Sequence, residues 1–176
     1  MDAVNALSAR REDTKVALRL NIKVRHLVSY WVPALTWMLV IFAASTDMMS
    51  AEHTSRFIAP FLRWLTPDVS VATIATVQLF VRKAAHLTEY AILGALLVRA
   101  FGSRDVRPAW GYAVVAWLLA VAWAGLDEFH QSFVSSRTGS PIDVMIDATG
   151  ALIGLSIYWC FARKRREQAP VVAEQF

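Results

Sequence analysis

The chain has 176 residues, of which 56% are hydrophobic and seven are tryptophan, and its formal net charge is +4 at pH 7. A soluble domain of this length has too little interior to bury so much apolar surface, so the composition excludes an ordinary water-soluble protein. The basic residues flank apolar segments and do not interleave with an aromatic stacking surface, which argues against a nucleic-acid-binding module.

Four long apolar segments predict transmembrane helices. They are residues 27–44, 69–98, 110–126 and 144–162. Each approaches the roughly 20 helical residues that cross a hydrocarbon core about 30 Å thick. The second contains several ionisable residues and is expected to end at Arg99, while the fourth is interrupted only by Asp147. The first is expected to be a retained anchor, because its 26-residue leader is too long for a signal peptide.

The segment between the first two spans predicts a short interfacial helix on the outer side. Apolar residues recur there on one helical face, namely Phe57, Ile58, Phe61, Leu62 and Leu65, with Trp64 beside them. The other Trp residues and the Met residues are expected to face lipid or the membrane interface. The predicted fold is therefore an all-α, polytopic membrane helical bundle of four transmembrane helices plus a short outer interfacial helix.

The distribution of Lys and Arg predicts that both termini are cytoplasmic, in a multi-pass protein of the inner (cytoplasmic) membrane. Thirteen of the 18 lie on one side: Arg10, Arg11, Lys15, Arg19, Lys23, Arg25, Arg99, Arg104, Arg107, Arg163, Lys164, Arg165 and Arg166. We expect a basic cytoplasmic arm at 1–26, a transmembrane domain at 27–162 and a basic cytoplasmic tail at 163–176. Cys160 is the only cysteine, which excludes an internal disulfide.

The ionisable residues within the spans are expected to meet at one depth. At a rise of 1.5 Å per residue, His86, Asp127 and Asp147 all lie roughly 20–26 Å above the cytoplasmic ends of their helices. An unpaired ionisable side chain in a spanning helix costs roughly 2.5–3.5 kcal/mol, so these groups must pair with one another or reach water. We therefore expect a polar pocket that opens to the outside.

Two segments carry a resemblance to a known family: "RKAAHLTEYAILGALL" (82–97) and "LDEFHQSFVSSRTGSPIDVMIDATGALIG" (126–154). They resemble the VanZ-like family pattern, a Lys-x-x-His-x-x-x-Tyr helix followed by Asp-Glu-x-x-Gln, an Arg, Ser-x-x-Asp and a Gly-x-x-x-Gly helix. The matching residues are Lys83, His86, Tyr90, Asp127, Glu128, Gln131, Arg137, Ser140, Asp143, Gly150 and Gly154. The Ser45–Thr46 end of the first span also resembles a short Ser-containing element of that family.

The chain departs from this pattern at two places. Asp147 stands where the pattern more often has Asn, and residues 133–136 replace the Pro-Gly that often precedes the Arg. The resemblance implies an integral membrane protein, in a family named for a member linked to glycopeptide (teicoplanin) resistance. It implies no particular reaction.

Two functions from different classes remain open. In the first, the pocket binds the head group of a polar lipid or cell-wall precursor and contributes to glycopeptide tolerance. The expected ligand-binding residues are Arg82, Lys83, His86, Glu89, Tyr90, Asp127, Glu128, Gln131, Arg137, Asp143 and Asp147. In the second, a membrane-embedded hydrolase or transferase acts on a lipid-linked substrate. Its candidate catalytic residues are His86, Glu89, Asp127, Glu128 and Asp143.

Purely structural roles for the same residues also remain open. His86 and Glu89 are three residues apart and could satisfy each other by a hydrogen bond, as buried polar groups require. Asp127 and Glu128 could be a solvated helix end. No nucleophile elbow, phosphate-binding loop or zinc motif is present, which lowers the enzyme hypothesis. A small transporter is disfavoured because there are only four spans and no broken-helix repeat.

The last two alternatives concern a helix cap and a metal. Asp143 could serve only as the N-cap of the last span, a role that Ser140 could also fill. A metal site of His86, Glu89 and His130 is disfavoured, because His130 is expected to face away from the acids and no cluster has metal-ligand spacing. We expect no metal, no cofactor and no nucleic-acid partner, with membrane lipid or a lipid-linked envelope precursor as the partner.

Overall fold

The computed structural model describes residues 10, 14–22, 24–25, 27–46, 51–102, 110–133 and 140–167, and its regular structure is entirely helical. The elements are the π-helical turn η1 (Leu27–Trp31), α2 (Val32–Ala44), α3 (Ala51–Leu65), α4 (Val71–Phe101), α5 (Trp110–Gln131) and α6 (Pro141–Glu167). Four helical segments are long and apolar enough to cross a membrane: Thr14–Ala44, Val71–Phe101, Trp110–Gln131 and Pro141–Lys164. The predicted all-α membrane bundle is confirmed.

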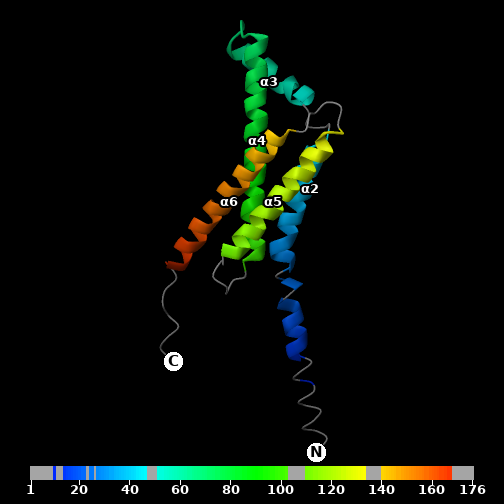
Figure 1. The fold of residues 1–176 in the computed structure, drawn as a ribbon, viewed down its shortest axis with the longest axis vertical. Helices are drawn as coiled ribbons and strands as arrows, with labels where there is room; N and C mark the ends of the chain where they lie inside the picture. Colours follow the sequence, from blue (N-terminus) through cyan, green and yellow to red (C-terminus); the bar gives the residue numbers. More distant parts are fainter. Residues whose placement is uncertain are drawn as a thin grey trace, which may run out of the picture.

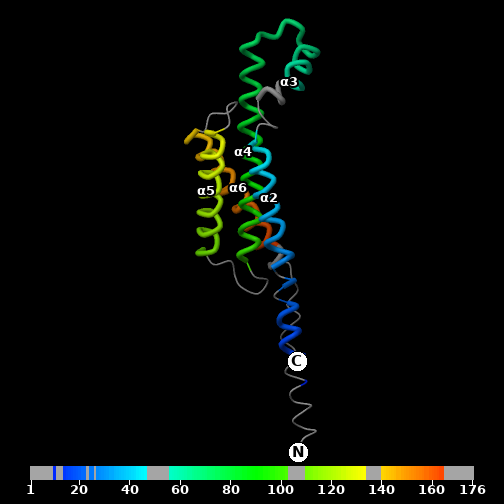
Figure 2. The backbone as a smooth tube through the Cα atoms, turned by 90° about the vertical axis from the view of Figure 1, so that its right-hand side faces the viewer, coloured from blue at the N-terminus to red at the C-terminus, as the bar shows by residue number. Residues whose placement is uncertain are grey.

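The four spans form one bundle in which α2 and α5 run in the direction opposite to α4 and α6 (Figure 1). Turned by 90°, α5 lies on one side of α4 and α2 on the other, with α6 behind (Figure 2). The end of α4, the start of α5 and the end of α6 therefore lie at the same end of the bundle as the start of α2. The opposite end gathers the residues in which we expected a polar site.

Helices α4 and α6 approach each other so closely that only glycine fits at several contacts. A Cβ atom built on Gly150 would overlap the backbone carbonyl of Leu87, and one on Gly154 would overlap that of Ala91. Small residues at helix interfaces allow this close approach in membranes, where the hydrophobic effect does not hold helices together. The predicted inward-facing Gly150/Gly154 stripe is confirmed, and it turns the acids of the same face of α6 towards α4.

Pro33 explains the irregular start of the first span. A proline has no N–H, so the carbonyl four residues earlier, that of Ser29, loses its helical donor. The guanidinium of Arg99, at the end of α4, donates to that carbonyl over 3.3 Å. The π-helical turn η1 lies at this point and ends two residues before Pro33. The helix also continues back to Thr14, well before residue 27, because no proline or glycine occurs between them.

Two tryptophans pack between helices, contrary to the expectation that they face lipid or the interface. The indole nitrogen of Trp37 on α2 donates to the backbone carbonyl of Glu89 on α4 over 2.9 Å. That of Trp117 on α5 donates to the carbonyl of Ala148 on α6 over 3.0 Å. An indole N–H inside the bundle needs such a partner, because lipid offers none. These bonds join α2 to α4 and α5 to α6.

Helix α4 is much longer than a hydrocarbon core. Its 31 residues span about 46 Å, and it extends past the ends of α2, α5 and α6, where α3 folds back against it (Figures 1 and 2). Ser70 caps it by accepting from the backbone N–H of Thr73 over 3.1 Å, and it ends at Phe101 rather than at Arg99. In α3, Phe57, Phe61, Trp64 and Leu65 are exposed, as an amphipathic helix at a membrane surface would require.

Candidate functional site

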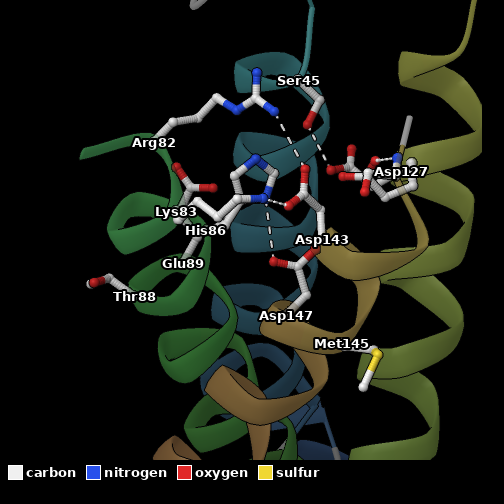
Figure 3. A network of polar contacts seen from close by, with 12 residues as sticks. Ser45, Arg82, Lys83, His86, Thr88, Glu89, Asp127, Asp143, Met145 and Asp147 are labelled. Carbon is white, nitrogen blue, oxygen red and sulfur yellow. Dashed lines mark hydrogen bonds and ion pairs between the residues drawn. The ribbon is translucent and has the colours of Figure 1, made fainter. Parts of the chain in front are cut away.

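Seven buried polar side chains from four helical segments lie together at the end of the bundle near α3 (Figure 3). We call them the polar cluster; they are Ser45, His86, Asp127, Glu128, Gln131, Asp143 and Asp147. The last six belong to the predicted ligand-binding set, and Ser45 belongs to the Ser-containing element noted in the sequence. The equal depth expected from the helical rise is therefore confirmed by direct contacts.

Asp143 joins α6 to two cations of α4. Its carboxylate accepts from the ammonium of Lys83 through one oxygen and from the guanidinium of Arg82, 3.4 Å away, through the other. The Asp143 side chain is only 3% exposed, whereas those of Arg82 and Lys83 are 32% and 30% exposed. We call these two cations the basic rim, because they lie between the polar cluster and the surface.

His86 pairs with Asp147 across the α4–α6 contact. Its ring nitrogen Nδ1 lies 3.2 Å from a carboxylate oxygen of Asp147, and both side chains are buried. The alternative that His86 is satisfied by Glu89 is therefore wrong, because its hydrogen bond crosses to another helix. Glu89 is half-buried beside this pair (Figure 3), and Tyr90 is completely buried one turn farther along α4.

Asp127 links the end of α2 to the end of α5. One of its oxygens accepts from the Ser45 hydroxyl over 2.8 Å and from the Gln131 amide over 3.0 Å. Asp127 and Glu128 are 2% and 5% exposed, so the alternative of a solvated helix end is wrong. Helix α5 continues to Gln131 and carries both acids inside the bundle.

Glu128 is held by the start of the next helix rather than by a cation. One of its oxygens accepts from the backbone N–H of Ser140 over 2.8 Å. The hydroxyl of Ser140 in turn accepts from the N–H of Ile142 over 3.3 Å, so Ser140 caps α6 in front of Pro141. Ser140 thus fills the capping role left open for Asp143, whose side chain binds the basic rim. Arg137, another predicted ligand-binding residue, lies outside the described residues.

Several buried polar atoms of the site have no hydrogen-bond partner among the residues that the structure describes. They are one oxygen each of Asp127, Glu128 and Asp147, and the hydroxyl of Tyr90. Orphaned buried atoms of this kind are rare and indicate a function or a bound group. His130 is not among the acids: its ring stacks on Phe42 with centroids 4.4 Å apart, as the expectation that it faces away requires.

The arrangement brings together groups that could hold a metal ion. His86, Glu128 and Asp147 each offer one ligand atom, and these atoms lie within 4.8 Å of one another. This set differs from the His86, Glu89 and His130 set considered from the sequence. Sequence spacing could not reveal it, because its three members come from α4, α5 and α6.

Comparison with known proteins agrees with the motifs. The family model described as VanZ/LLP1 matches residues 30–162, which include all four helical segments that contribute to the polar cluster. No curated protein and no solved structure gives a significant match. The matched part also contains the tight α4–α6 contact and the ion pairs of Asp143. The chain is therefore a multi-pass membrane protein that belongs to the VanZ/LLP1 family.

Proposed function

We propose that this VanZ-family protein binds the anionic head group of a membrane lipid or of a lipid-linked cell-wall precursor. The observation that carries the proposal is the basic rim, where two cations share a single carboxylate. One positive charge therefore remains, and the guanidinium and ammonium groups keep donors beyond those that Asp143 accepts. A phosphate group of a lipid would supply the missing negative charge and the acceptors.

The depth of the basic rim suits a head group. Arg82 and Lys83 lie on α4 close to the level at which α2 and α5 end, and about a third of each side chain is exposed. Head groups lie at this boundary, where the hydrocarbon core gives way to the polar layer. Basic sites between transmembrane helices are a recurrent means of binding anionic lipids.

The positive-inside rule supports a site on the outer face of the inner membrane. Most basic residues flank the end of the bundle opposite the polar cluster, so both termini are proposed to be cytoplasmic. An outer site would meet lipid-linked cell-wall precursors on the side where they are consumed. A contribution to glycopeptide (teicoplanin) tolerance is then the expected consequence of precursor binding.

The alternative, a hydrolase or transferase, would need a nucleophile beside a base. Ser45 donates to Asp127, whereas His86 contacts Asp147. Within the described residues, no hydrogen bond joins a serine hydroxyl to a histidine, the pairing that commonly activates such a nucleophile. Binding without a reaction therefore remains the proposed function.

The test is to identify lipid that stays bound to the purified protein. The full chain is extracted in mild detergent, and retained lipid is counted and identified by native mass spectrometry. We expect an anionic, phosphate-containing lipid on wild type and a loss of about tenfold or more in the Arg82→Gln, Lys83→Gln double variant.

Two control variants separate this result from general effects. Leu118→Ala changes an exposed apolar residue of α5, and Arg63→Gln removes an exposed cation of α3; both should retain the lipid. If the rim double variant folds and retains as much lipid as wild type, the proposed head-group site is wrong. Glycopeptide susceptibility of cells carrying the same variants then distinguishes a precursor from a bulk lipid.

A further inference from the structure

The strongest unexplained feature is a group of three buried side chains behind the basic rim. His86 on α4, Glu128 on α5 and Asp147 on α6 are 6%, 5% and 0% exposed. One ligand atom of each lies within 4.8 Å of the other two. The helices fix these positions from the backbone outward, since α4 and α6 touch at Leu87 and Gly150, next to His86 and Asp147 in the helical rows.

Two of the three residues direct an unsatisfied oxygen into the protein interior. Glu128 uses one oxygen for the N–H of Ser140, and Asp147 uses one for His86. The second oxygen of each carboxylate is buried without a hydrogen-bond partner in the described part of the chain. A buried carboxylate oxygen without a donor or a cation is costly, so both oxygens call for a positively charged partner.

The charges of the buried acids leave room for two positive charges. The basic rim neutralises Asp143 and can offset one further acid, Asp127, which otherwise contacts only the neutral Ser45 and Gln131 in its printed hydrogen bonds. Glu128 and Asp147 then carry two negative charges, and a neutral His86 adds none. A single divalent cation between them would restore neutrality in an environment of low dielectric constant.

We propose that His86, Glu128 and Asp147 bind a divalent transition-metal ion. One imidazole nitrogen and two carboxylate oxygens suit Zn²⁺, Mn²⁺ or Fe²⁺. An ion equidistant from three atoms 4.8 Å apart lies about 2.8 Å from each, so inward shifts of at most about 0.7 Å give the usual distances of roughly 2.0–2.2 Å. The proposal does not depend on head-group binding, because the three ligands and the rim are different residues.

The first experiment measures metal bound by the wild-type chain. The full chain is purified in detergent with a tag that contains no histidine, treated with a chelator, reloaded with Zn²⁺ or Mn²⁺ and desalted. Elemental analysis should then find one ion per chain. In the Mn²⁺-loaded protein, pulsed electron paramagnetic resonance should detect one coordinated imidazole nitrogen, that of His86.

Matched variants test the ligand set. Glu128→Gln and Asp147→Asn keep the shape of each side chain, and each should weaken metal retention by at least about tenfold, the loss that second-shell changes alone can cause. Asp127→Asn removes a buried acid outside the ligand set and should retain the ion. A folded wild type that binds no stoichiometric metal overturns the proposal, as does an ion without nitrogen coupling. Unchanged retention in Glu128→Gln and Asp147→Asn overturns it too. If a variant fails to fold, the two wild-type measurements decide.

Discussion

Asp143 is the residue on which the basic rim depends, because its one carboxylate binds both Arg82 and Lys83. Asp143→Asn keeps the shape of the side chain and leaves two cations close together without an acid. We expect it to lower the free energy of unfolding by about 1–3 kcal/mol. The cost stays below that of breaking a fully buried pair because water reaches about a third of each cation side chain. Unfolding in mixed micelles measures it.

A double-mutant cycle separates this ion pair from other effects of the substitution. Adding Lys83→Gln to Asp143→Asn should cost less than the sum of the two single changes, with a coupling of about 0.5–3 kcal/mol. Strict additivity of the two changes would mean that the Lys83–Asp143 contact contributes nothing to stability.

Ser45 is the only contribution of α2 to the polar cluster, through its hydrogen bond to Asp127. Ser45→Ala removes one donor from a buried carboxylate, so we expect a loss of about 1 kcal/mol in the free energy of unfolding. Ser156→Ala is the control, because the exposed Ser156 hydroxyl bonds only to the carbonyl of Leu152 in its own helix. Equal melting temperatures for Ser45→Ala and wild type would count against the α2–α5 link.

At the residue scale, the sequence predicts which polar residues are buried but not how they pair. Helical phase and depth place His86, Asp127 and Asp147 correctly, because both follow from the regular rise and rotation of a helix. The pairing of His86 with Asp147 rather than with Glu89 depends on how far α4 slides along α6. That offset is fixed by glycine contacts between the helices, which no local pattern specifies.

The same limit explains why the bond from Ser140 to Glu128 is not predictable from the sequence. It depends on the path of the chain between α5 and α6. The capping role of Ser140 is a local property, and its position before Pro141 is a signal that sequence reasoning can use. Cross-helix partners need the tertiary arrangement.

At the scale of helices, the α4–α6 contact should be the most sensitive to added volume. Gly154→Ala would place a methyl group on the backbone carbonyl of Ala91, so the two helices must separate. We expect a loss of about 1–3 kcal/mol or more in the free energy of unfolding. Separation would also disturb the His86–Asp147 pair, one turn away from Gly150 along the same stripe.

Gly125→Ala provides a control with the opposite expected sign. A Cβ atom on Gly125 of α5 meets nothing within 4 Å, so alanine there adds helix propensity without a clash. We expect a gain of up to about 1 kcal/mol. If Gly154→Ala melts as high as Gly125→Ala in detergent, close backbone packing does not hold α4 against α6.

Element existence is the part of the fold that composition determines best. All four spans and α3 are predicted, because membrane thickness fixes the length of an apolar segment and amphipathic periodicity marks α3. Helix ends differ more: α4 continues past Arg99, and the first helix continues back past residue 27. Polar residues can prolong a helix beyond the apolar core, so hydropathy alone does not give its ends.

For the whole molecule, the distribution of charge predicts the orientation in the membrane. A reporter that is active only in the cytoplasm should be active when fused after Arg104 or Arg166 and inactive after Ser136. The even number of spans requires the ends of the chain to share a side, as the bundle has them (Figure 1). Activity of the fusion after Ser136 would place the polar cluster on the cytoplasmic side and contradict an outward-facing site.

The account rests above all on the claim that the polar cluster opens to the outside through the basic rim and is not sealed packing. The sole cysteine, Cys160, is replaced by alanine, and Lys83→Cys is then labelled in intact cells with a membrane-impermeant maleimide. Ala120→Cys, at a completely buried position of α5, is the control that should not react. We expect Lys83→Cys to be labelled from the outside before the membrane is permeabilised. Labelling of Lys83→Cys only after permeabilisation, or no labelling of a folded variant under either condition, would contradict the account.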